Sequence, residues 1–112
     1  MDEQPMKLSE AIREGAKKRP QAFRGFFRTV NGQLCSCALG AAYEAATGKA
    51  IEDADTDDIA YGLEDAIGIN PFELDAPVAG WEYALGNYIE HLNDGLKHSR
   101  EQIADWLQSI GY

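Results

Sequence analysis

Ser36-Cys-Ala-Leu-Gly-Ala-Ala-Tyr-Glu-Ala-Ala-Thr-Gly48 is the stretch of this 112-residue chain that decides its fold. Apolar residues, most of them alanine, fall on nearly every side of the helix that this stretch would form. A helix without a clear polar face is usually buried, and small side chains let neighbouring helices approach closely. We therefore predict a central helix from Cys37 to Thr47, capped by Ser36 and ended by Gly48 in the left-handed conformation.

A shorter helix is predicted before this central one. Ser9 is its candidate N-cap, and Pro20 forbids its continuation. The apolar residues that recur at helical spacing are Leu8, Ala11, Ile12 and Ala16.

A small β-hairpin is predicted between these two helices, from Gly25 to Cys37. Asn31-Gly32 accepts the positive φ angles that a two-residue type I′ turn requires. The register that this turn sets pairs Val30 with Gln33 and Arg28 with Cys35. Because two strands alone are only marginally stable in water, we expect Phe26 or Phe27 to anchor the ribbon on the helices.

Three more helices are predicted in the second half of the chain. One begins at Thr56 and ends at Gly68, with its apolar face formed by Ile59, Leu63, Ala66 and Ile67. An irregular segment, 69–79, follows. A regular apolar stripe then predicts a helix from Trp81 to Asn93 or Asp94. The last helix opens at Ser99, which forms a capping box with Gln102, and ends at Gly111.

These patterns predict a mainly α protein, a compact bundle of about five helices with a small β-hairpin after the first. We expect residues 1–7 to be a frayed N-terminus and residues 8–112 to form a single globular domain. No apolar run approaches the roughly 18 residues that a spanning helix needs. Cys35 and Cys37 lie too close for an easy disulfide, which fits a reducing compartment. We therefore expect a cytoplasmic protein.

The charge is strongly negative and unevenly distributed. Ten basic and nineteen acidic residues give a formal net charge of −9, which repels nucleic acid and anionic membranes. Seven basic and four acidic residues lie from Met1 to Arg28, and three basic and fifteen acidic residues follow, so the two parts carry +3 and −12. The candidate acidic face comprises Asp53, Asp55, Asp57, Asp58, Glu64 and Asp65.

The basic N-terminal part is the first candidate binding site. Its residues are Arg13, Lys17, Lys18, Arg19, Arg24 and Arg28, with Phe23, Phe26 and Phe27 among them. One interpretation is a basic, aromatic patch for an anionic partner. The other is that these cations pair with the protein's own acidic face while the phenylalanines enter the core.

A second hypothesis is that the last two helices form a DNA-binding helix-turn-helix. Arg100 is the only basic residue of the final helix, whereas Glu101 and Asp105 would lie near phosphates. A phosphate interface needs several cations, so ordinary antiparallel helix packing is the favoured interpretation.

Two metal-binding patterns are incomplete. Asp53, Asp55 and Asp57, with Glu64 at the twelfth position, have the ligand spacing of a calcium loop, but Asp58 replaces the glycine of the sharp turn. Acidic residues are in any case expected in a first helical turn. Cys35 and Cys37 with His91 and His98 provide only one cysteine pair of a zinc site. We predict no bound metal and no cofactor.

Cysteine chemistry gives one more alternative. Cys37 near a helix N-terminus would have a depressed thiol pKa, which would permit redox or nucleophilic reactions. Packing in the interior is the competing interpretation, since cysteine is often buried. No phosphate-binding glycine loop, serine elbow or zinc-protease motif is present in the sequence. We therefore do not expect an enzyme.

Three blocks together resemble a scattered group of short, acidic bacterial and phage-borne proteins without an assigned activity. The blocks are Leu8-Ser9-Glu10-Ala11-Ile12-Arg13 with Arg19-Pro20-Gln21, then Cys37-Ala38-Leu39-Gly40-Ala41-Ala42, and His91-Leu92-Asn93-Asp94 with Ser99 to Trp106. Some members carry a Cys-Pro-x-Cys knuckle, where this chain has Asp75-Ala76-Pro77-Val78. The resemblance implies a compact accessory protein and no catalytic motif.

The sequence therefore favours a small cytosolic accessory or inhibitor protein that acts by binding another protein. A phage-derived form would use its acidic surface to mimic nucleic acid toward a basic partner. The alternatives are a helix-turn-helix regulator and a metal- or thiol-dependent small protein. The sequence names neither the partner nor an oligomeric state.

Overall fold

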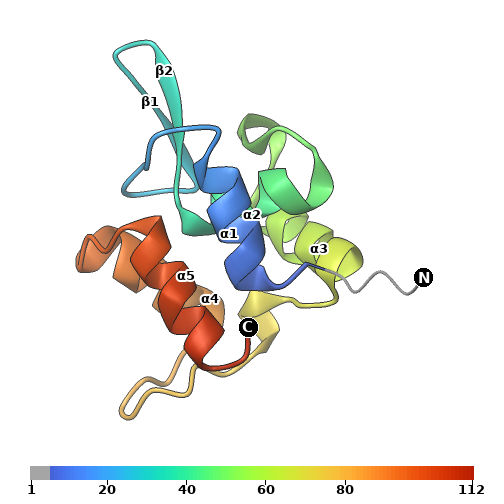
Figure 1. Cartoon of the computed structure of the whole chain (residues 1–112), viewed down its shortest axis with the longest axis vertical. Helices are drawn as coiled ribbons and strands as arrows, with labels where there is room; N and C mark the ends of the chain where they lie inside the picture. The colour runs from blue at the N-terminus through green and yellow to red at the C-terminus, as the bar shows by residue number, and fades with distance from the viewer. Residues whose placement is uncertain (1–5) are drawn as a thin grey trace.

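A computed structural model describes residues 6–112, which form five α-helices and one two-stranded antiparallel sheet (Figure 1). The helices are α1 (Leu8–Ala16), α2 (Ala38–Thr47), α3 (Thr56–Ile67), α4 (Leu85–Glu90) and α5 (Arg100–Ser109). The strands are β1 (Phe27–Val30) and β2 (Gln33–Ser36). Two 3-10 turns, η1 (Ile51–Asp53) and η2 (Pro71–Glu73), and a π-helical turn, η3 (His91–Gly95), complete the order. The predicted mainly α fold is confirmed.

Helix α2 lies at the centre, as its sequence predicts. All seven residues from Ala38 to Glu44 are buried, and the helix contacts α1, α3 and α4. Its contact with α1 is close because Gly15 has no side chain, and a Cβ there would collide with the carbonyl group of Ala41. Gly48 ends α2 at a φ of 73°, in the predicted left-handed conformation.

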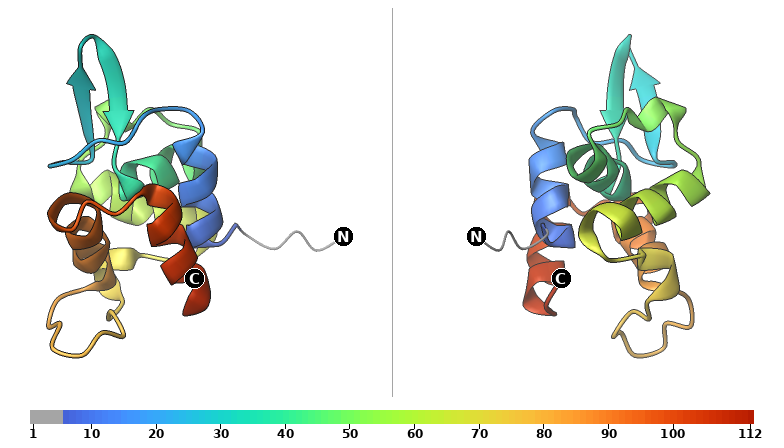
Figure 2. Two further views of the ribbon diagram at one scale, coloured as in Figure 1. Left: turned by 60° about the vertical axis from the view of Figure 1, so that its left-hand side comes forward. Right: turned by 90° about the vertical axis from the view of Figure 1, so that its right-hand side faces the viewer.

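The hairpin follows the predicted register and projects away from the helices (Figures 1 and 2). Val30 pairs with Gln33, and Arg28 pairs with Cys35. Asn31 and Gly32 have φ angles of 52° and 78°, as a type I′ turn requires. Of the two candidate anchors, Phe26 packs against the core, whereas Phe27 is exposed.

Two helix starts differ from the prediction because other residues occupy the cap position. The N-cap of helix α1 is Lys7, two residues before the predicted cap, and Ser9 is buried in the first turn. The Ser9 hydroxyl donates to the carbonyl oxygen of Tyr112, which ties the start of the helix to the C-terminus. Cys37, not Ser36, caps α2, since its sulfur accepts from the Gly40 N–H.

The fourth helix is shorter than predicted. Trp81 and the next three residues precede α4, because Ala84 lies in an isolated antiparallel bridge with Asp75 and the Leu85 N–H donates to Leu74. Ala84 itself is extended, with a φ of −68° and a ψ of 163°. The Trp81 ring instead packs edge-on against Tyr88, with centroids 5.0 Å apart.

The capping box at Ser99 is confirmed, and α5 presents Ile103 and Leu107 to the core. Helix α3 also has the predicted start and a left-handed end at Gly68, with Asp55 as its N-cap. Ala66, expected on the apolar face of α3, is exposed.

Candidate functional site

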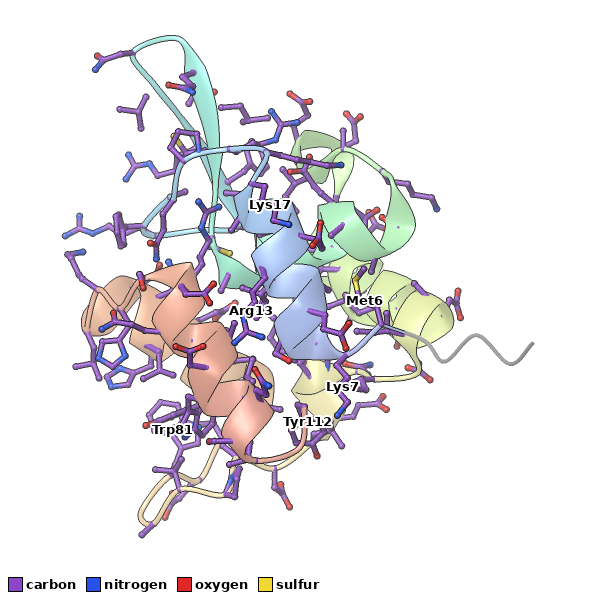
Figure 3. The ribbon with its side chains drawn as sticks, in the orientation of Figure 1. Met6, Lys7, Arg13, Lys17, Trp81 and Tyr112 are labelled. Atoms are coloured by element: carbon purple, nitrogen blue, oxygen red, sulfur yellow. The ribbon has the colours of Figure 1, made fainter. Side chains whose placement is uncertain are left out.

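Three of the six cations in the predicted basic patch form ion pairs with acidic residues of the same chain. Arg13 of α1 reaches toward α5 (Figure 3), where its guanidinium group bonds Glu101 at 3.1 Å and Asp105 at 2.6 Å. Hydrogen bonds with Asp105 and Glu101 raise the pKa of Arg13. Lys17 pairs with Glu14 of its own helix at 2.9 Å. Arg13 and Lys17 therefore pair with acidic residues of the chain, but these partners lie outside the predicted acidic face.

Arg19 joins the loop after α1 to the central helix. Its Nε and Nη2 atoms donate to the two carboxylate oxygens of Glu44 at 2.8 and 3.0 Å. Glu44 is buried and also accepts from the Ile51 N–H. Burial opposes the charged form, but the Arg19 hydrogen bonds and charge and the Ile51 N–H outweigh it and lower the pKa of Glu44. Arg19 thus has a structural role.

Three cations of the predicted basic patch are not used in this way. Lys18, Arg24 and Arg28 are exposed, and the structure from residue 6 onward shows no ion pair at these three positions. No aspartate or glutamate occurs from residue 15 to residue 43.

A further cation joins this surface from a distant part of the chain. The Lys97 ammonium group lies over the Phe23 ring, 4.6 Å from its centroid. Sequence reasoning missed Lys97, because no local pattern links it to a phenylalanine so far away in the sequence. We call the resulting surface the hairpin end; its residues are Phe23, Arg24, Phe27, Arg28, Val30 and Lys97.

The predicted acidic face is exposed and lies around η1 and α3. Figure 1 places α3 on a different side of the molecule from the projecting hairpin. All six predicted carboxylate side chains, Asp53, Asp55, Asp57, Asp58, Glu64 and Asp65, belong to exposed residues. The Asp55 carboxylate accepts from the Asp58 N–H at 2.8 Å, so the calcium-like spacing is that of a helix cap.

Arg100, considered above as the only base of a recognition helix, points into the protein. Its guanidinium group donates to the Ser36 carbonyl and hydroxyl groups and to the Arg19 carbonyl group, the last at 2.6 Å. Burial lowers the pKa of Arg100. Helix α5 therefore presents no basic side chain outward, and both of its acidic residues, Glu101 and Asp105, pair with Arg13.

The cysteines are free and buried, in agreement with the packing interpretation. Burial raises the pKa of Cys37 to about 12, so its thiol is protonated at neutral pH. The expected depression at a helix N-terminus is wrong, because desolvation outweighs the hydrogen bonds from the helix N–H groups. Within residues 6–112, no group of three or more histidine, cysteine or acidic residues could hold a metal ion.

A cavity of about 100 Å³ lies where the hairpin meets α2 and α4. Glu90 and Asp94 are among its lining residues, and burial followed by the Asp94 charge raises the pKa of Glu90. The lining residues are Gly25, Phe26, Cys37, Ala38, Leu39, Ile89, Glu90, Asn93 and Asp94.

Asn93 connects the cavity wall to the loop before the hairpin. Its side-chain oxygen accepts from the Ala38 N–H and from Gln21, and its amide group donates to the Ala22 carbonyl oxygen at 2.8 Å. Asn93 is buried in η3. This residue was not identified as special from the sequence, since these three partners lie 55 to 72 residues away.

No family model, curated protein or solved structure matches this chain. Residues 6–112 contain no helix that is both long enough and apolar enough to cross a membrane. The surface residues are therefore the basis for a functional proposal.

Proposed function

We propose that the protein acts by binding another protein, and that the hairpin end makes the contact. The observation that carries this proposal is the exposure of both cationic and apolar side chains on a projecting ribbon. Phe27 and Val30 are 36% and 50% exposed, and Arg28 lies between them on β1. Aromatic residues and arginine are enriched at protein interfaces.

The charge distribution supports an acidic partner surface. Apart from Lys97, the residues of the hairpin end lie in the stretch 15–43, which has no acidic residue, while exposed carboxylates gather around α3. Such a separation of charge orients an approaching partner and favours a complementary patch. Glu90 and Asp94, which line the cavity at the base of the hairpin, are half-buried.

An accessory or inhibitory role fits this arrangement, because the acidic face stays free to meet a basic surface when the hairpin end is occupied. The helix-turn-helix alternative gains no support from the fold. Its second helix has only one basic residue, Arg100, and that side chain is buried. A phosphate interface requires several outward cations.

Site-specific photo-crosslinking in the native host tests the proposal. A photoreactive amino acid at Val30 should give a discrete adduct with one protein, whereas the same group at Tyr61 should not. Tyr61 is a matched control, because it is 58% exposed but lies on α3. Adducts from Tyr61 alone, or no protein adduct from Val30, would overturn the proposal.

A further inference from the structure

The outer edge of β1 is open. Strand β2 pairs with β1 on one side, and all four residues of β1 are exposed. The opposite edge of β2 is partly closed, because the Ser36 N–H donates to Pro20 and the Ser36 carbonyl oxygen accepts from the Ala22 N–H. Only β1 therefore offers a free edge along its length in the described sheet.

The direction of each backbone group on this edge follows from the hairpin register. In an antiparallel pair, residues alternate between those that exchange hydrogen bonds with the partner strand and those that do not. The two-residue turn makes Val30 a bonded residue, and the Cys37 N–H donating to Phe26 at 3.0 Å continues the same alternation. The N–H and C=O groups of Phe27 and Thr29 therefore point outward.

Ser36 confirms this alternation from the other strand. It is paired with Phe27 in the register, and both of its backbone groups bond outward to residues 20 and 22. Phe27 and Thr29 have the corresponding outward groups on β1. An extended segment alongside β1 would thus meet two N–H donors and two C=O acceptors, spaced as in a β-sheet.

We infer that an extended acidic segment of the partner adds to β1 as a third strand; this inference rests on the proposed function. Arg28 and Val30 would lie on one side of the sheet beside the added strand, and Phe27 and Thr29 on the other. This alternation fits a segment in which acidic and apolar residues alternate. A second copy of the chain is disfavoured as occupant, because pairing two β1 edges would bring two Arg28 residues together.

Residue-resolved amide hydrogen exchange of the full chain tests the inference. The probe is a capped peptide in which glutamate and valine alternate; its control replaces each glutamate with lysine. The acidic peptide should slow exchange at the Phe27 and Thr29 amides. No protection there would overturn the inference. So would equal protection by the lysine peptide, protection only by a duplex oligonucleotide, or protection of the chain alone that grows with its concentration.

A proline substitution separates strand addition from charge attraction. Thr29→Pro removes an outward N–H without removing a ladder bond, and proline is tolerated on edge strands. We expect Thr29→Pro to weaken binding of the acidic peptide by about tenfold or more, with Thr29→Ala close to wild type. Nuclear Overhauser effects between Val30 and Gln33 and between Arg28 and Cys35 verify that the hairpin is intact in the variant.

The two proposals fail in distinguishable ways. If Thr29→Pro, with an intact hairpin, keeps both peptide binding and the Val30 adduct, strand addition is overturned and the hairpin end stands as the protein-binding surface. Failure of the Val30 adduct in the wild-type protein would overturn the proposed function itself.

Discussion

Asn93 holds together three segments that the sequence separates widely. Replacing it with alanine would leave the Ala38 N–H and the Ala22 carbonyl group without their side-chain partner. Because buried polar groups are costly to leave unpaired, we expect Asn93→Ala to lower the free energy of unfolding by about 3 kcal/mol. Urea denaturation measures this loss. Asn87→Ala, on the exposed face of α4, is the control, and an equal effect of the two would contradict the assigned role.

Glu44 should make stability depend on pH. Its folded-state pKa is lowered, so its contribution is fully present above the ordinary glutamate pKa and is lost as the pH falls through the lowered value. The stability difference between wild type and Glu44→Gln should therefore be largest at about pH 7 and shrink below about pH 4.3. Thermal unfolding at several pH values measures it.

Glu14→Gln is the matched control for this experiment, because Glu14 is also ion-paired but exposed. Exposed pairs contribute little to stability, so its difference from wild type should stay small throughout. A stability difference for Glu44→Gln that does not change with pH would contradict the account of the Arg19 pair.

At the scale of elements, the contact between α1 and α2 depends on Gly15. A Cβ there would collide with the Ala41 backbone, which cannot move aside as a flexible side chain would. We expect Gly15→Ala to destabilise the protein by about 2 kcal/mol or more, despite the better helix propensity of alanine. Glu14→Ala, at an exposed neighbouring position, should have a small effect. Denaturation curves of both variants measure these changes in unfolding free energy. A Gly15→Ala variant more stable than wild type would contradict the close packing of α1 and α2.

Local signals made some elements predictable. The hairpin register follows from Asn31-Gly32 alone, and the ends of α2 and α3 follow from glycines that adopt left-handed φ angles. The start of α4 was not predictable, because Ala84 bridges Asp75 and is extended rather than helical. A regular apolar stripe cannot reveal such a tertiary contact.

The candidate site was predictable only in part for the same reason. The sequence identified the cations but not which of them form ion pairs within the protein, since the partners of Arg13 lie 88 and 92 residues away. It also counted Arg100 as an outward charge, whereas that residue crosslinks β2 and the loop after α1. Pairing of distant charges depends on how helices pack, which periodicity does not determine.

At the scale of the whole molecule, the protein has two oppositely charged regions. Its formal net charge is −9, while the hairpin end presents arginine and apolar side chains on a projecting ribbon. This contrast supports recognition of an acidic protein surface. Salt should weaken that binding, because at 0.1 M ionic strength the attraction between exposed charges is largely screened beyond a separation of roughly 10 Å.

The central claim is tested most directly by the yield of the Val30 photo-adduct after reversal of charge. Arg24→Glu with Arg28→Glu should lower the yield about tenfold or more, since both cations would then repel an acidic partner. Lys7→Glu with Lys49→Glu reverses the same number of exposed charges elsewhere and should leave the yield unchanged. Equal yields from the two double variants would contradict binding through the hairpin end.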